Sequence, residues 1–290
     1  MSHRNLGAER LSKWQKTMSA QTLSVPILVG DDDDWQVGKK EALHRLVRSA
    51  KTSYVLLTDG DVSVSSRWVE AVMDSAWGTD LLMLPVRMSV DSGVRGWQAL
   101  WQRAQALEFA SLVGSGMAMC GLGHPIMCNG AGLLVKTDKW LESWDDLHPE
   151  LPSGDDVFLL HSFKRRGLTV RYATAPDTAV CTTPSHSLSD FWRQRTRWAS
   201  KATAYTDRDT IAVAAFVALT NVLWLATLLQ PLCFIAFWLV KSLADYSFFR
   251  RITLLYKAGH TLPLTLFINL LYPFYAILTP LAALLRKKQW

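Results

Sequence analysis

The stretch Tyr54-Val55-Leu56-Leu57-Thr58-Asp59-Gly60-Asp61 holds the clearest fold signal in the chain. Its first residues form a compact, mostly apolar run of the length that is typical of a buried parallel strand. The run ends in two carboxylates separated by one glycine. Ligands of open α/β sheets bind at the carboxyl ends of the strands, so this position suits a binding site.

Helix-like and strand-like segments alternate on both sides of this stretch. Apolar spacing and capping residues predict helices at residues 8–20, 39–50, 67–77, 96–113 and 155–166, and one that starts at Ser187 or Ser189. Strands are expected at residues 24–29, 54–58, 81–86, 132–136, 170–173 and 178–182. A loop rich in Gly and Met is expected between residue 113 and His124-Pro125. The alternation predicts an α/β fold with a mainly parallel sheet and flanking helices.

Composition limits the class of protein. The 290 residues suffice for one sizeable α/β domain with a membrane segment, or for two small domains. The four cysteines form no CxxC pair, so neither a zinc site nor a disulfide framework is indicated, as in a reducing cytosol. The stretch Met1–Thr22 lacks the apolar core of a signal peptide, so the soluble part is expected in the cytoplasm.

The C-terminal third has the composition of a membrane domain. Residues 211–240 carry no charge, and as a single helix they would measure about 45 Å, longer than a hydrocarbon core of about 30 Å. Pro231 can divide this stretch. We expect a soluble domain at 1–208 and a membrane domain at 209–290, with two or three transmembrane helices at about 211–229, 231–249 and 262–285.

The charges near these spans favour a membrane as partner. Lys241 and Asp245, spaced i and i+4, can pair within the second span. The excess of 31 basic over 25 acidic residues gathers beside the apolar stretches, as expected for contact with anionic lipids, so nucleic-acid binding is not expected. The basic cluster 286–288 favours an even number of crossings, and the cluster 250–257 favours three; the two alternatives stay open.

Two acidic pairs are the first candidates for chemistry. Mg²⁺ and Mn²⁺ prefer oxygen ligands, and Mg²⁺ takes one or two carboxylates beside substrate phosphates, which Asp59 and Asp61 can provide. A turn rich in Asp and Gly is the structural alternative. Asp155 and Asp156 stand at a helix start, where they can cap the helix or remove a proton from an attacking hydroxyl.

A third candidate lies shortly before the membrane spans. Gln194, Arg197 and Trp198 are spaced i, i+3 and i+4, so they share one helix face. An amide, a guanidinium and an indole suit a diphosphate and a sugar ring. A basic, aromatic helix lying at the membrane surface is the alternative, and both can hold at once.

Taken in order, these motifs resemble those of a membrane-bound family 2 glycosyltransferase with the GT-A fold, similar to cellulose synthase-like and hyaluronan synthase-like enzymes. The last motif matches the family signature Q-x-x-R-W, and Gly154-Asp155-Asp156 stands where the family usually has Thr-Glu-Asp. The matching segments are Gly38-Lys39-Lys40, Thr58-Asp59-Gly60-Asp61, Cys128-Asn129-Gly130-Ala131-Gly132, Gly154-Asp155-Asp156 and Gln194-Arg195-Thr196-Arg197-Trp198.

The resemblance implies a role for each matching residue. Asp59 and Asp61 would contact the diphosphate of a nucleotide sugar and hold Mg²⁺ or Mn²⁺, with Asp61 the more direct ligand. Asp156 would be the catalytic base. The remaining substrate-binding residues would be Lys39, Asp155, Gln194, Arg197 and Trp198, of which Gln194 and Arg197 hold the leaving diphosphate and Trp198 helps form the acceptor site.

The same resemblance implies a reaction and a location. We expect a hexosyl- or N-acetylhexosaminyltransferase that takes its sugar from a UDP-sugar and inverts the anomeric carbon. Its acceptor would be a polysaccharide or lipid-linked molecule, and its place a multi-pass position in the inner membrane with a cytoplasmic catalytic domain. The alternative is a catalytically idle subunit that keeps the GT-A fold for binding or assembly.

One departure from the family gives a prediction. Family members begin with a strand, a helix and a second strand that grip the base and ribose, whereas about 24 residues precede the first predicted strand here. The acidic turn Asp31–Asp34 is expected to be a solvated loop, with a uridine contact as the alternative. We therefore expect this chain to bind UDP more weakly than a longer version that carries the missing unit. Equal UDP affinities of the two would contradict this expectation.

Overall fold

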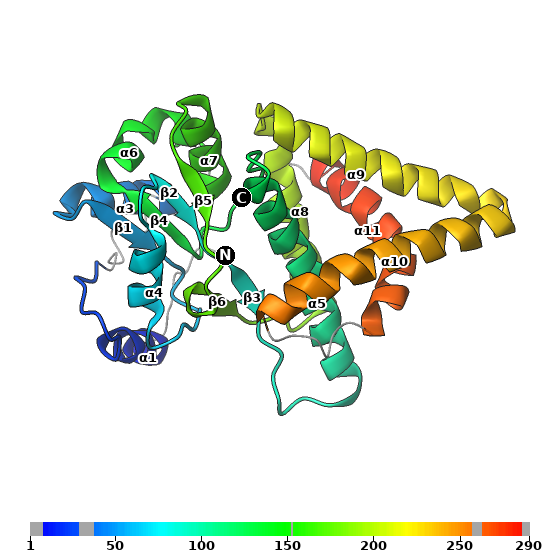
Figure 1. The fold of residues 1–290 in the computed structure, drawn as a ribbon, viewed down its shortest axis with the longest axis horizontal. Coiled ribbons are helices and arrows are strands. Elements are labelled where there is room, and N and C mark those ends of the chain that lie inside the picture. The colour runs from blue at the N-terminus through cyan, green and yellow to red at the C-terminus, as the bar shows by residue number, and fades with distance from the viewer. Residues whose placement is uncertain (1–7, 29–37, 152, 257–262, 286–290) are drawn as a thin grey trace. The chain divides into compact units, whose positions relative to one another are not determined.

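The computed structural model describes residues 8–28, 38–151, 153–256 and 263–285 (Figure 1). Its contacts divide the chain into two compact units. The first comprises Met1–Arg87 and Gly116–Thr182, and the second Met88–Ser115 and Thr183–Trp290. Each unit is described by itself below, and the boundary at residue 208 stays a prediction about where the membrane domain begins.

A four-stranded sheet forms the centre of the first unit. Its order is β1-β4-β2-β5, with β1 at Tyr54–Leu57, β2 at Leu81–Met83, β4 at Leu133–Lys136 and β5 at Val170–Tyr172. β2 pairs parallel to β5, whereas β4 runs antiparallel to both β1 and β2. Three strands therefore share one direction and β4 opposes them. The predicted α/β fold is confirmed, and its sheet is mixed.

Helices flank this sheet, and their positions largely match the predicted ones. The first unit contains α1 (Ala8–Ser19), α3 (Lys39–Ser49), α4 (Trp68–Ser75), α6 (Thr137–Glu142) and α7 (Asp155–Arg165), with short 3₁₀ turns η1 (Trp144–Leu147) and η2 (Pro176–Thr178). α3 packs against α6, and α7 packs against β5. All three residues of β2 are buried, as are Leu133, Leu134 and Val135 of β4. The core of this unit thus follows the central strands.

Two predicted strands differ from the structure. The predicted strand 81–86 divides into β2 and β3 (Val86–Met88), because Leu84 still donates its N–H to Gly132 while Pro85, which has no N–H, accepts from Val180. β3 pairs instead with β6 (Val180–Thr182). The strand predicted at 24–29 is wrong for residues 24–28: they adopt no regular structure and pair with no described strand, and Val29 lies outside the described residues.

The helix predicted at 96–113 is longer in the structure. α5 runs from Gly96 to Gly121, so the first part of the expected Gly- and Met-rich loop is helical. A Cβ at Gly114 would lie 1.8 Å from the Cδ1 atom of Ile252. The glycine therefore allows a neighbouring helix to pack closely, and this packing offsets its low helix propensity.

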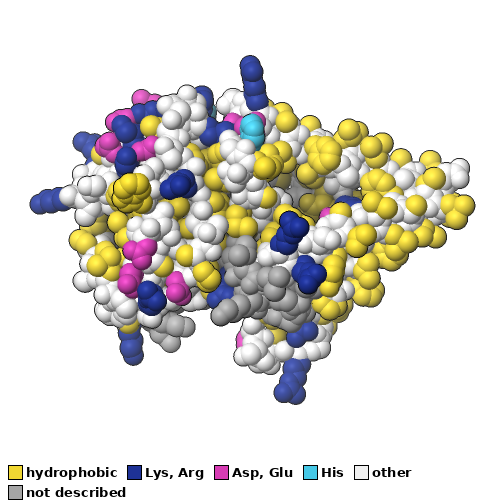
Figure 2. Space-filling view, in the orientation of Figure 1, with side chains coloured by type: hydrophobic (Ala, Val, Ile, Leu, Met, Phe, Trp, Pro, Cys, Tyr) yellow, Lys and Arg dark blue, Asp and Glu magenta, His cyan; other side chains and the backbone are white. Residues whose placement is uncertain are grey.

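In the C-terminal part of the second unit, all regular elements among the described residues are helices, joined by short connections. Its elements are α8 (Leu188–Ala199), η3 (Ser200–Ala204), α9 (Arg208–Ala226), η4 (Thr227–Leu229), α10 (Pro231–Tyr256) and α11 (Thr265–Leu285). α10 begins at Pro231, as predicted, and Lys241 pairs with Asp245. Three helices within the described residues are long and apolar enough to cross a membrane. Figure 2 shows hydrophobic side chains spread over the surface of α9 and α10.

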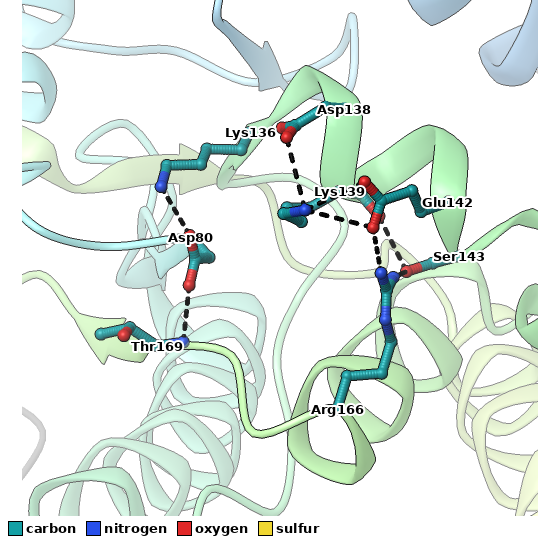
Figure 3. A network of polar contacts seen from close by, with 8 residues as sticks. All are labelled: Asp80, Lys136, Asp138, Lys139, Glu142, Ser143, Arg166 and Thr169. Carbon is teal, nitrogen blue, oxygen red and sulfur yellow. Dashed lines mark hydrogen bonds and ion pairs between the residues drawn. The ribbon is translucent and has the colours of Figure 1, made fainter.

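An ion pair beside the sheet links three segments of the first unit (Figure 3). Asp80 accepts a hydrogen bond of 2.8 Å from the backbone N–H of Thr169 and pairs with Lys136 at 2.7 Å. Burial alone would raise the pKa of Asp80, but the Lys136 ammonium and the Thr169 N–H outweigh it, and the pKa is lowered. Asp80 precedes β2, Lys136 ends β4 and Thr169 precedes β5, so one carboxylate links the ends of three strands.

We expect Asp80→Asn to lower the free energy of unfolding by about 1–3 kcal/mol at neutral pH, because a charge-assisted hydrogen bond and an ion pair are weakened. The folded pKa of Asp80 is lowered, so its contribution is present above the unfolded pKa of about 3.9 and is lost as the pH falls through the folded value. Urea unfolding of wild type and variant from neutral to acidic pH measures this difference. Asp138→Asn, on an exposed neighbour, should change stability by no more than about 0.5 kcal/mol; equal effects of the two substitutions would contradict the prediction.

Candidate functional site

An ion pair at the carboxyl end of β1 is the centre of the candidate site in the first unit. Asp59 follows β1 by two residues, and Lys39 is the first residue of α3. The Lys39 Nζ atom lies 3.1 Å from Asp59 Oδ1, and both side chains are about one-third exposed, at 34% and 28%. Two predicted substrate-binding residues, about 20 positions apart, therefore meet in the fold.

Asp155 and Asp156 belong to the same electrostatic group. Burial by itself would lower the pKa of Lys39, but the carboxylates of Asp155, Asp59 and Asp156 raise it above its ordinary value. The ammonium therefore remains charged at all physiological pH values. Asp155 is buried and Asp156 half-buried at the start of α7, where two acids also suit the helix dipole.

A tight turn before β4 holds the Asp156 carboxylate. Gly130 donates its N–H to Asp156 Oδ2 at 3.2 Å, and Val157 donates to Oδ1 at 2.9 Å. The turn itself is closed by Asn129, whose side-chain oxygen accepts from the N–H of Ala131 at 3.0 Å. A Cβ at Gly130 would lie 3.6 Å from Asp156 Cβ and 3.7 Å from Asp155 Oδ2, so the turn lies in contact distance of both acids.

The same turn is joined to the end of β1. The Thr58 hydroxyl donates to the carbonyl of Ala131 at 2.9 Å, one residue before Asp59. A continuous path of bonded groups therefore runs from Asp59 through Thr58 and the turn to Asp156. The resemblance gave residues 128–132 only as a matching segment; their hydrogen bonds orient the Asp156 carboxylate and tie it to the end of β1.

The buried contacts of Lys40 orient α3 so that the neighbouring Lys39 side chain faces these acids. Lys40 is only 4% exposed, and its Nζ atom donates to the carbonyls of Leu147 and His148 at 2.6 and 2.8 Å. It also lies 5.0 Å from the centre of the Phe158 ring. Because neighbouring helix residues point about 100° apart, this buried anchor fixes the direction of the Lys39 side chain.

Asp61 differs from the other acids of this site. It is exposed in the turn after β1 and has no hydrogen bond or ion pair with any described residue. Among the described residues there is also no group of three or more His, Cys, Asp and Glu side chains that could hold a metal ion. A free carboxylate of this kind fits a divalent cation whose other ligands are substrate phosphates and water.

The third predicted motif lies on α8 in the second unit. Ser187 caps this helix by accepting the N–H of Asp190 at 3.1 Å, which confirms one of the two predicted starts. Gln194, Arg197 and Trp198 are half-buried. The Arg197 side chain makes no hydrogen bond, ion pair or ring contact with a described residue, so its guanidinium N–H groups could bind a ligand.

Arg195, which lies between Gln194 and Arg197 in the sequence, differs from Arg197 in its burial and contacts. Arg195 is 2% exposed and pairs through two of its nitrogens with Glu108 of α5. It also donates to the Gln194 side-chain oxygen at 2.5 Å. The spacing of the motif did not single out Arg195 or Glu108 as important, because their contact joins residues 87 positions apart.

The structure therefore groups Lys39, Asp59, Asp155 and Asp156 within the first unit and Gln194, Arg197 and Trp198 within the second. Asp61 lies two residues after Asp59 and has no hydrogen bond or ion pair with the described residues of the first group. Asp31–Asp34 lie outside the described residues. A cavity of about 250 Å³ in the first unit is lined by other residues, including Ser63, Arg87 and Cys181.

Comparisons with known proteins assign the family. The chain matches no curated protein. Among solved structures it is similar to one described as the crystal structure of a mycobacterial protein, with 16% identity over 63% of this chain and a TM-score of 0.30. The chain spans 53% of that protein, and a likeness at this level supports no argument. Residues 25–201, more than half of the chain, match the family described as "Glycosyltransferase like family 2". The chain therefore belongs to the glycosyltransferase-like family 2.

Proposed function

We propose that this chain transfers a hexosyl or N-acetylhexosaminyl group from a UDP-sugar to a glycan or lipid-linked acceptor, with inversion at the anomeric carbon. Membership of family 2 supports glycosyl transfer in general. The observation that carries the more specific proposal is the Lys39–Asp59 ion pair at the carboxyl end of β1, together with Asp155 and Asp156 at the start of α7.

The proposed reaction is a single displacement. The acceptor hydroxyl oxygen forms a bond to the anomeric carbon while the bond from that carbon to the phosphate oxygen breaks. The hydroxyl proton passes to Asp156, whose carboxylate is oriented by the N–H groups of Gly130 and Val157. The bonding electron pair leaves with UDP.

The chain offers positive charge for the leaving diphosphate. Lys39 remains protonated because its neighbouring carboxylates raise its pKa. Gln194 and Arg197 are proposed to bind the same diphosphate, and Trp198 to contact the acceptor sugar. Mg²⁺ or Mn²⁺, when bound, would neutralise part of the diphosphate charge, and Asp61 with Asp59 would hold it.

The proposed location is supported by the apolar helices. Three helices could span a membrane, so a membrane protein is supported. We propose the inner membrane, with the first unit on the cytoplasmic side where nucleotide sugars are made, and with membrane lipids around α9, α10 and α11. A membrane location suits a lipid-linked or exported acceptor.

The first test of this proposal is transfer from labelled UDP-sugars by membranes that contain the chain. We expect turnover that requires a divalent cation, and Asp156→Asn should lower kcat by about 10²- to 10⁴-fold because it removes the base. Asp61→Ala should raise the cation concentration that gives half-maximal rate. Asp74→Asn and Asp74→Ala, on the exposed face of α4, are the matched controls and should leave rates unchanged.

Two outcomes would contradict the proposal. If the Asp156→Asn variant keeps the wild-type kcat, Asp156 is not the catalytic base. Binding of UDP without turnover of any hexose or N-acetylhexosamine donor would instead favour the idle subunit, which keeps the fold for binding or assembly.

A second test concerns Lys39. Lys39→Met should weaken UDP binding by about tenfold or more, because a charge-assisted contact to phosphate is lost and the nearby acids then repel the ligand. Isothermal titration of UDP measures this effect, with Lys51→Met on the exposed residue after α3 as control. A lower thermal stability with unchanged UDP affinity would show that Lys39 serves the fold alone.

A further inference from the structure

A buried polar cluster in the second unit joins three helices around the Q-x-x-R-W segment. Arg195 of α8 and Glu108 of α5 are 2% and 7% exposed. Arg195 Nε lies 3.2 Å from Glu108 Oε1, and Arg195 Nη2 contacts Oε2, so the pair is bidentate. The Tyr275 hydroxyl of α11 donates to Glu108 Oε1 at 3.0 Å. One carboxylate therefore connects α5, α8 and α11.

Arg195 in turn contacts two side chains of the motif. Its Nη1 donates to Gln194 Oε1 at 2.5 Å. Its guanidinium carbon lies 4.4 Å from the centre of the Trp198 ring and 4.6 Å from that of Phe191. The guanidinium therefore stacks on the indole and fixes the amide orientation of its neighbour.

These contacts leave Arg195 no capacity for a substrate. Its Nε and both terminal nitrogens are engaged by protein groups, and its side chain is excluded from solvent. Arg197, two residues on, makes no side-chain hydrogen bond, ion pair or ring contact with a described residue. The two arginines therefore differ in what they can do. Arg197 could bind a ligand directly, whereas Arg195 can affect a ligand only through the residues that it contacts.

Stability alone does not account for this pair. Desolvation of two charges roughly cancels their attraction, and well-packed apolar side chains of similar volume serve a core as well or better. A buried ion pair is better attested as a device that fixes one arrangement of side chains. Here the fixed arrangement includes Gln194 and Trp198.

We propose that Glu108 and Arg195 are positioning residues for glycosyl transfer, and that Tyr275 makes the arrangement of Gln194 and Trp198 depend on helix α11. The inference rests on the proposed function for the roles of Gln194 and Trp198. α11 is one of the three helices that could span a membrane, so a candidate membrane helix helps to order the substrate-binding motif.

The sharpest variant is Tyr275→Phe, which removes one hydroxyl and keeps the ring. Tyr272→Phe is the matched control: it lies on the same helix, its ring centre is 5.9 Å from that of Tyr275, and its hydroxyl has no hydrogen bond with a described residue. Measured on the full chain in membranes, Tyr275→Phe should lower kcat by about tenfold, because a small misplacement of a binding group is costly. Tyr272→Phe should keep the wild-type kcat and KM.

A combined variant separates positioning from stability. Glu108→Leu, Arg195→Met and Tyr275→Phe together replace the polar cluster by apolar side chains, so no buried charge is left unpaired. We expect its thermal unfolding midpoint to stay within a few degrees of wild type while kcat falls about a hundredfold. A cluster that only holds the fold would predict an unchanged kcat. If the combined variant does not fold, the comparison of Tyr275→Phe with Tyr272→Phe decides.

A measurement that does not depend on catalysis distinguishes failure of this inference from failure of the proposed function. Amide hydrogen exchange of residues 188–199 should be about tenfold faster in Tyr275→Phe than in wild type and Tyr272→Phe. Wild-type kcat, KM and exchange in Tyr275→Phe would overturn the inference. If wild-type membranes transfer no sugar, the proposed function fails and positioning for transfer fails with it, while the exchange rates still decide whether the cluster orders α8.

Discussion

In the candidate site of the first unit, the Lys39 ammonium lies among three carboxylates and forms an ion pair with one of them, Asp59. Asp59, Asp155 and Asp156 come from the end of a strand and the start of a helix, and their carboxylates would repel one another if nothing compensated them. Lys39 supplies this compensation from a third element, α3. The Lys39 ammonium therefore links β1, α3 and α7 electrostatically at the carboxyl end of β1. In the proposed function the same cation faces the diphosphate of the donor.

Two pairs of like residues illustrate how the chain separates support from binding. Lys40 is buried and bonded to backbone carbonyls, while Lys39 remains partly exposed beside Asp59. Arg195 is buried against Glu108, while Arg197 has no described partner. In each pair the two side chains leave a helix in different directions, at about 100° per residue. One member of each pair then fixes its helix, and the other is the one proposed to bind a ligand.

The candidate membrane helices place polar groups between them and apolar groups outward. Asn269 donates to the Ser242 hydroxyl at 3.3 Å, and both side chains are buried. Lys241 pairs with Asp245, and its ammonium lies 5.6 Å from the centre of the Tyr272 ring. Polar groups in a hydrocarbon layer need partners within the protein, so this distribution suits a membrane. It also explains why Tyr275 of α11 can reach Glu108 without facing lipid.

Local signals in the sequence determined most of the elements and the identity of the motif residues. Apolar run length gave β1 and the three long helices, Ser187 marked the start of α8, and Pro231 marked the start of α10, because each of these depends on residues a few positions apart. Only the tertiary structure decided the direction of β4, the lack of pairing at residues 24–28 and the extension of α5 past Val113, since each depends on a partner far along the chain. The partnership of Glu108 with Arg195 belongs to the same class. An acid in the middle of a helix carries no local mark of the arginine 87 positions away that it binds, because desolvation and pairing exist only once the chain has folded.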